Sequence, residues 1–163
     1  MQNLIIFAHT FWKDSKVNRA LLEKLKDNKN VNIHNLSVIY PDGKINSVKS
    51  EVALLKEADN IIFQFPLFWF SMPSLLKEWQ DFVLSDILHG SDNKILENKT
   101  FKIITTAGGE KSFYDSLDFN IKEILSPINT SFKHLGLKIK EPFCIFGANK
   151  DNLPIKEYLN IFK

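Results

Sequence analysis

Cysteine is nearly absent from this chain of 163 residues, and its scarcity restricts both the chemistry and the compartment. The one cysteine, Cys144, cannot form an internal disulfide or build a thiolate cluster for a metal ion, so we predict no metal site and a reducing compartment. Cys144 lies within the apolar run Phe143–Phe146, which favours a buried, unreactive thiol over a nucleophile.

Long hydrophobic runs and an excess of one charge are also missing. No apolar segment approaches the roughly 20 residues of a membrane-spanning helix, and no basic leader precedes the first apolar run. The net charge is only +2, and the lysines are scattered among acidic residues, so no basic stripe favours nucleic acid or an anionic membrane surface. We therefore expect a cytoplasmic protein that binds no nucleic acid and does not insert into a membrane.

The chain alternates short apolar runs with amphipathic segments, which is typical of repeated βα units on a parallel sheet. With 44% hydrophobic and 25% charged residues, it can form one domain over residues 1–163 with a full core. Strands are predicted at Asn3–Ala8, Val31–Asn35, Asn60–Phe65, Phe101–Thr106 and Lys138–Phe146. Helices are predicted at Lys16–Lys26, Val48–Glu57, Pro73–Leu84, Ile121–Leu135 and Leu153–Phe162. The predicted fold class is α/β: a doubly wound five-stranded parallel sheet of order 2-1-3-4-5, with helices on both faces.

A dense aromatic segment, Phe63–Phe70, lies where the third predicted strand passes into the next helix. Pro66 ends the strand, and Pro73 suits the first turn of a helix, because neither residue has a backbone donor. Ligands of open α/β sheets bind outside the carboxyl ends of the strands, so this loop lies at the binding edge and favours a flat ligand. Aromatic clusters also fill cores and subunit interfaces, and that alternative stays open at this point.

The loop that follows the first strand, residues 8–18, brings a histidine, hydroxyls and an amide to the start of a helix. Backbone N–H groups and the helix dipole attract anions at such a point, and His9, Ser15 and Asn18 could add hydrogen bonds to a phosphate. A simple helix cap by Asp14 or Ser15 is the alternative.

The loop after the fourth strand, Thr105–Tyr114, contains paired glycines that let a ligand approach the backbone and two threonines that can hydrogen-bond a heterocycle. It lacks the spacing of a GxGxxG or Walker loop, which disfavours a Rossmann or ATPase site. An anion loop, an aromatic loop and a glycine-rich loop on one sheet edge suit flavin mononucleotide (FMN), with its phosphate in the first loop and its ring between the other two. The residues predicted to bind the cofactor are His9, Ser15, Lys16, Val17, Asn18, Pro66, Leu67, Phe68, Trp69, Phe70, Thr105, Thr106, Ala107, Gly108 and Gly109.

In these motifs the chain resembles the NAD(P)H:quinone oxidoreductase family of flavodoxin-like flavoproteins. That group includes quinone reductases, modulator-of-drug-activity proteins and ancillary subunits of potassium-efflux systems. Its opening pattern of histidine, serine and asparagine is matched by His9, Ser15 and Asn18. Its flavin-loop pattern, Gln-Phe-Pro-Leu-Tyr-Trp-Phe-Ser-x-Pro-x-x-Leu-Lys-x-Trp, is matched over residues 64–79, with Phe68 in place of the tyrosine. Further matches are Thr105–Gly109, Pro142, Phe143, Gly147 and Ala148.

The resemblance implies a flavodoxin-like fold and a homodimer with FMN or FAD at the subunit interface. It also implies hydride transfer from NADPH or NADH to the flavin, and then to a quinone-like acceptor in the same pocket, by a ping-pong mechanism. Tyr114 would be the catalytic residue, because it falls near a family tyrosine that orients substrate or assists proton transfer. Two departures stand out: the histidine that quinone reductases place after this tyrosine is missing from Asp115–Ile121, and Thr10 replaces a proline.

Two other functions are compatible with the same fold, because a fold does not determine a function. One is a flavin-binding regulatory subunit that docks on a membrane potassium-efflux transporter. The other is an electron-carrying flavodoxin, which is disfavoured because such carriers are usually strongly acidic and this chain carries a net charge of +2. The sequence leaves open the acceptor, the choice between NADH and NADPH, and the choice between FMN and FAD.

Overall fold

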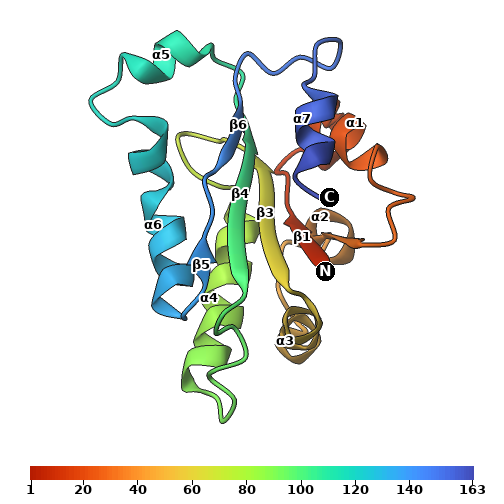
Figure 1. The fold of residues 1–163 in the computed structure, drawn as a ribbon, viewed down its shortest axis with the longest axis vertical. Helices are drawn as coiled ribbons and strands as arrows, with labels where there is room; N and C mark the ends of the chain where they lie inside the picture. Colours follow the sequence, from red (N-terminus) through yellow and green to blue (C-terminus); the bar gives the residue numbers. More distant parts are fainter.

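The computed structural model, which describes residues 1–163, is built around one parallel sheet of order β2-β1-β3-β4-β5, with β6 also paired to β4 (Figure 1). The strands are β1 (Asn3–Phe7), β2 (Val31–Asn35), β3 (Asn60–Pro66), β4 (Thr100–Thr106), β5 (Lys138–Ile139) and β6 (Phe143–Ile145). The helices are the 3-10 helix η1 (Trp12–Asp14), α1 (Val17–Glu23), α2 (Leu36–Ile39), α3 (Val48–Glu57), α4 (Ser74–His89), α5 (Lys111–Asp115), α6 (Ile121–His134) and α7 (Ile155–Asn160). All strand pairs are parallel, so the predicted sheet order is confirmed.

The sheet separates two hydrophobic layers of different size. The larger layer packs α3, α4 and α6 against one face, and Phe63 and Trp79 are among its fully buried side chains. The smaller layer packs α1 and α7 against the other face, where Leu21 and Tyr158 are fully buried. Figure 1 shows α1 and α7 on one side of the strands and α6 on the other. Every residue of β1 is buried, as expected for a parallel strand covered on both faces.

Several predicted boundaries differ from the observed ones. The last predicted strand, Lys138–Phe146, is interrupted between β5 and β6, where Pro142 has no N–H group to donate to the ladder. Helix α4 continues to His89 instead of ending at Leu84, because no proline or glycine interrupts it before Gly90. The predicted first and last helices are shorter in the structure, and η1, α2 and α5 lie in segments predicted as loops. None of the helices combines the length and apolar composition needed to cross a bilayer.

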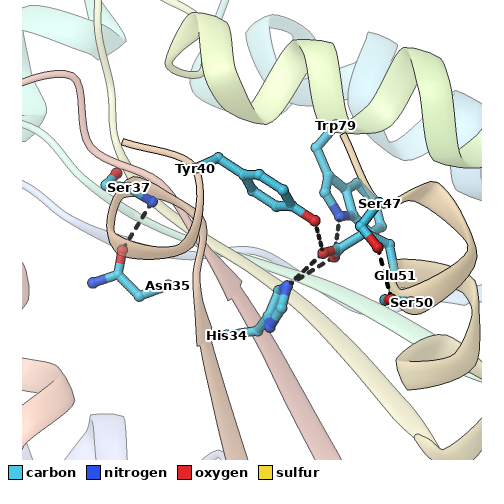
Figure 2. A network of polar contacts seen from close by, with 8 residues as sticks. All are labelled: His34, Asn35, Ser37, Tyr40, Ser47, Ser50, Glu51 and Trp79. Atoms are coloured by element: carbon cyan, nitrogen blue, oxygen red, sulfur yellow. Dashed lines mark hydrogen bonds and ion pairs between the residues drawn. The ribbon is translucent and has the colours of Figure 1, made fainter. Parts of the chain in front are cut away.

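A buried carboxylate cross-links the larger layer. Glu51 in α3 is 2% exposed and accepts hydrogen bonds from His34 in β2, from Tyr40 at the end of α2 and from Trp79 in α4. Figure 2 shows the three side chains pointing at the two carboxylate oxygens, with Tyr40 Oη 2.5 Å from Oε1 and Trp79 Nε1 2.7 Å from Oε2. Burial raises the pKa of Glu51, but the hydrogen bonds from all three side chains outweigh burial and hold the pKa below its ordinary value. The cluster therefore fixes α3 and α4 relative to β2.

Candidate functional site

Three loops meet at the carboxyl edge of β1, β3 and β4 and surround a pocket of about 280 Å³. The tips of β3 and β4 lie side by side there, because Pro66 pairs with Thr106 in the parallel ladder. Ten of the fifteen predicted cofactor-binding residues line the pocket, together with Asp14 and Ala148, which were not predicted. The ten are His9, Ser15, Lys16, Val17, Asn18, Pro66, Leu67, Thr106, Ala107 and Gly108.

The first loop offers hydrogen-bond donors that no other part of the chain uses. Ser15 is 5% exposed, and its Oγ has no partner in the protein. The Nδ1 atom of His9 accepts from the N–H of Phe11 at 3.0 Å, so a neutral His9 carries its hydrogen on Nε2. Burial lowers the pKa of His9, although Asp14 opposes this change, so the ring is neutral near pH 7. Buried donors without partners at the start of a helix suit an anion such as phosphate.

Asn18 has a different environment from the one predicted. It is 2% exposed, its Nδ2 donates to Thr106 Oγ1 at 2.9 Å, and its Oδ1 accepts from Gln64 Nε2 at 3.2 Å. Both ends of the amide are therefore bonded to the protein, and Asn18 connects α1 to β3 and β4 beneath the pocket.

The aromatic loop reverses direction within two residues. The backbones of Phe68 and Ser71 exchange hydrogen bonds of 2.9 and 2.8 Å, and the residues between them, Trp69 and Phe70, have φ values of +45° and +60°. This left-handed conformation costs a non-glycine residue about 1–2 kcal/mol, and such strain is concentrated at ligand and active sites. The Trp69 side chain is 93% exposed, so the packing alternative within this chain does not apply to it.

The other aromatic side chains join the loops to one another outside the pocket. Phe68 lies edge-on to both His9 and Phe11, with ring centroids 5.8 Å apart in each pair. The Phe70 ring lies 6.4 Å from that of Tyr114. Phe68, Trp69 and Phe70 therefore border the pocket without lining it.

Tyr114, the predicted catalytic residue, lies in α5 beyond the glycine-rich loop. It is 7% exposed, and burial raises the pKa of its hydroxyl. Its ring packs against Gly109 so closely that a Cβ added to this glycine would lie 3.2 Å from Tyr114 Cε2. Gly109 thus belongs to the wall that positions Tyr114 and does not line the pocket.

The glycine-rich loop is held by the chain that follows β6. Ala107 donates to the Ile145 carbonyl at 2.8 Å, and Ala148 donates to the Ala107 carbonyl at 2.9 Å, which explains the presence of Ala148 in the pocket wall. A Cβ added to Gly108 would meet no protein atom within 4 Å, so this part of the wall has room for a ligand close to the backbone. Thr105, in contrast, is fully buried and donates from Oγ1 to the Phe65 carbonyl at 3.0 Å, so its hydroxyl points away from the pocket.

The thiol of Cys144, in β6, is not suited to act as a nucleophile. Burial raises the pKa of Cys144 to about 11, against the effect of Lys102, so the thiol stays protonated at neutral pH. The residue is partly rather than fully buried, in contrast to the prediction. No group of three or more His, Cys, Asp or Glu side chains lies close enough together to hold a metal ion.

The amino-acid sequence of this chain is similar to those of known proteins. Residues 1–160 match the model of a protein family described by its flavodoxin-like fold. General stress protein 14 of Bacillus subtilis is 35% identical over 153 residues, which cover 91% of this chain and 87% of that protein. YrkL of the same organism, named as an uncharacterised NAD(P)H oxidoreductase, is 30% identical over 152 residues, 91% of this chain and 87% of YrkL. KefG of Cronobacter sakazakii, an ancillary protein of a glutathione-regulated potassium-efflux system, is 35% identical over 154 residues, 92% of this chain and 83% of KefG.

Two solved structures share both the fold and part of the sequence. General stress protein 14 of Treponema denticola, solved in complex with FMN, has a TM-score of 0.88 and 27% identity, and the match covers 99% of this chain and 98% of that one. An NADPH-quinone reductase from P. pentosaceus has a TM-score of 0.84 and 26% identity, with 99% and 95% of the two chains covered.

Proposed function

The chain belongs to the Flavodoxin_2 family of proteins with a flavodoxin-like fold, and we propose that it is a flavin-dependent NAD(P)H oxidoreductase that reduces a quinone-like acceptor. The observation that carries the proposal is the pocket at the carboxyl edge of the sheet. It combines a buried Ser15 hydroxyl without a partner, an open wall at Gly108 and a strained aromatic turn beside it. These features fit a phosphate joined to a flat heterocycle, and FMN has both parts.

Different residues of the pocket would hold different parts of FMN. The Ser15 hydroxyl, the His9 Nε2–H group and the first N–H groups of α1 would hold the phosphate, and Lys16 supplies a positive charge beside them. Thr106 and the backbone of Ala107 and Gly108 would hold polar atoms of the remainder. FMN, when bound, supplies two-electron redox chemistry, accepting a hydride from NADPH or NADH and passing it to the acceptor in a ping-pong cycle.

Tyr114 is the proposed catalytic residue. Burial raises the pKa of its hydroxyl, so the group keeps its proton at neutral pH. A protonated hydroxyl can orient a quinone oxygen and donate to it as negative charge develops there. Phe70 and Phe113, whose rings are stacked 6.4 Å apart, would exclude water from the same place.

The proposal includes a homodimer. Trp69, Phe113 and Phe119 are 93%, 47% and 66% exposed; Trp69 precedes Phe70 in the chain, and Phe113 and Phe119 lie near the Phe70 ring, and exposed apolar surface of this kind is typical of an interface. A second copy of the chain would cover these side chains and close the pocket. FAD in place of FMN is compatible with the same phosphate loop.

A second candidate function is regulatory. The 35% identity to KefG extends over 92% of this chain, so a flavin-binding subunit that docks on a potassium-efflux transporter is the alternative. The two functions differ in turnover, because a regulatory subunit needs a bound flavin but not rapid reduction of a free acceptor.

The visible spectrum of the FMN-loaded protein tests the proposal. Under anaerobic conditions, NADPH or NADH should bleach the flavin band, and 1,4-benzoquinone should restore it over many cycles. The apoprotein under the same conditions is the control for direct reduction of the quinone. If the flavin band bleaches but the quinone restores it only over many minutes, the regulatory function is favoured. If neither nucleotide bleaches the band, the proposed oxidoreductase activity and the proposed electron donor are both contradicted.

A further inference from the structure

A line of four buried side chains connects the far helix α7 to the pocket. Tyr158 Oη donates to Gln64 Oε1 at 2.8 Å, Gln64 Nε2 donates to Asn18 Oδ1 at 3.2 Å, and Asn18 Nδ2 donates to Thr106 Oγ1 at 2.9 Å. Tyr158 and Gln64 are 0% exposed, Asn18 is 2% exposed and Thr106 is 4% exposed. All four side chains are buried, and only Asn18 and Thr106 belong to the pocket wall.

The line has a direction, because each amide has an oxygen on one side and an NH₂ group on the other. If both amides were reversed, Tyr158 would accept from Gln64, and its own hydrogen would have no acceptor in a fully buried site. An unpaired buried donor is unfavourable, and burial raises the pKa of Tyr158, so the hydroxyl keeps this hydrogen. The hydrogen bonds must therefore run from Tyr158 outward.

This direction determines what Thr106 presents to a ligand. The Thr106 oxygen already accepts from Asn18, and no protein acceptor receives the hydroxyl hydrogen. Thr106 lines the pocket, so the hydrogen is available there. At this point the pocket should bind a hydrogen-bond acceptor, and it should discriminate against a donor.

We propose that Tyr158 is a positioning residue that, acting through Gln64 and Asn18, fixes the Thr106 hydroxyl as a hydrogen-bond donor toward the cofactor. The identity of FMN as the ligand rests on the proposed function, but the direction of the line does not. The Thr106 hydroxyl then selects an acceptor oxygen or an unprotonated ring nitrogen of the ligand. Helix α7, which contributes no residue to the pocket wall, thereby influences cofactor binding.

A double-mutant cycle on FMN binding tests this link. Thr106→Val removes the donor itself and should raise the dissociation constant of FMN about tenfold. Tyr158→Phe removes the side chain that sets the direction and should raise the constant by a similar or smaller factor. In a protein that already carries Thr106→Val, Tyr158→Phe should not change the dissociation constant of FMN further. In a protein that carries Thr106→Ser, which keeps the hydroxyl, Tyr158→Phe should still raise the constant.

Tyr40→Phe is the matched control, because it also deletes a buried tyrosine hydroxyl, in this case one that donates to Glu51 in the other hydrophobic layer. It should lower the melting temperature without changing FMN affinity. If the effects of Tyr158→Phe and Thr106→Val simply multiply, or if Tyr40→Phe weakens FMN binding equally, the positioning role is wrong.

The hydroxyl hydrogens can be observed without any cofactor. In proton NMR of the apoprotein, the Tyr158 hydroxyl should exchange slowly with solvent and show a cross-peak to Gln64, while the Thr106 hydroxyl should exchange rapidly. A slowly exchanging Thr106 hydroxyl directed at Asn18 would overturn the inference. Failure of the wild-type protein to bind FMN or FAD would contradict the proposed function, and this NMR result would still decide the direction of the line.

Discussion

The strained turn at Trp69 and Phe70 distinguishes a binding role from a packing role. Trp69 is 93% exposed at φ +45°, so Trp69→Gly removes almost no packing and releases the left-handed strain. The strain released is about 1–2 kcal/mol, and the added freedom of glycine in the unfolded chain costs about 0.4–1 kcal/mol. The free energy of unfolding should therefore stay constant or rise by up to about 1.5 kcal/mol, which is up to roughly 5 °C in melting temperature for a chain of this size.

The same substitution should strongly weaken FMN binding. An aromatic side chain stacked on a heterocycle contributes about 1–3 kcal/mol, so the dissociation constant should rise about 5- to 150-fold. Circular dichroism of the apoprotein gives the melting temperature, and quenching of FMN fluorescence gives the affinity. Phe82→Ala, which removes another exposed aromatic ring, one in α4 and outside the pocket wall, should change neither quantity. If Trp69→Gly lowers the melting temperature by several degrees, the residue packs against protein and the reasoning fails.

Three further substitutions test other parts of the account. Ser15→Ala should weaken FMN binding about tenfold and riboflavin binding much less, since only FMN carries the phosphate; equal losses in two parallel titrations would contradict a phosphate site. Tyr114→Phe should slow reoxidation of the reduced flavin by quinone about tenfold or more in stopped-flow experiments while FMN stays bound, and unchanged rates would remove Tyr114 from the mechanism. Glu51→Gln should lower the free energy of unfolding at pH 7 by about 2–4 kcal/mol in urea titrations, because charge-assisted hydrogen bonds are lost inside the protein. The folded pKa of Glu51 lies below its unfolded value near 4.3, so the wild-type protein should be more stable than the variant above pH 4.3. This difference in stability should be lost as the pH falls through the lower folded pKa. A difference in stability that does not depend on pH would be inconsistent with an ionised, hydrogen-bonded Glu51.

Local sequence signals were sufficient to predict the parallel sheet and most of the residues that line the pocket. The apolar strands alternate with amphipathic helices, and with right-handed crossovers this alternation restricts the fold to a few doubly wound sheets, of which the order β2-β1-β3-β4-β5 is the one observed. The loops after β1, β3 and β4 then meet at one edge, which brings ten predicted residues into one pocket. The interruption at Pro142 could also have been predicted, because proline cannot donate within a sheet ladder.

The remaining features depend on contacts between residues far apart in the sequence. His34, Tyr40 and Trp79 meet at Glu51 only after three helices have packed on the sheet, and Tyr158 meets Gln64 across 94 residues. No periodicity indicates such pairs. The two-residue turn at Trp69 and Phe70 contradicts local preferences, because asparagine and glycine favour positive φ, and only the surrounding structure holds aromatic residues there.

The most direct test of the central claim is a fluorescence titration of the purified wild-type apoprotein with FMN. The account predicts saturable quenching that ends near one FMN per chain, with riboflavin binding more weakly because it lacks the phosphate. Absence of saturation with both FMN and FAD would contradict the claim that the carboxyl edge of β1, β3 and β4 is a flavin site.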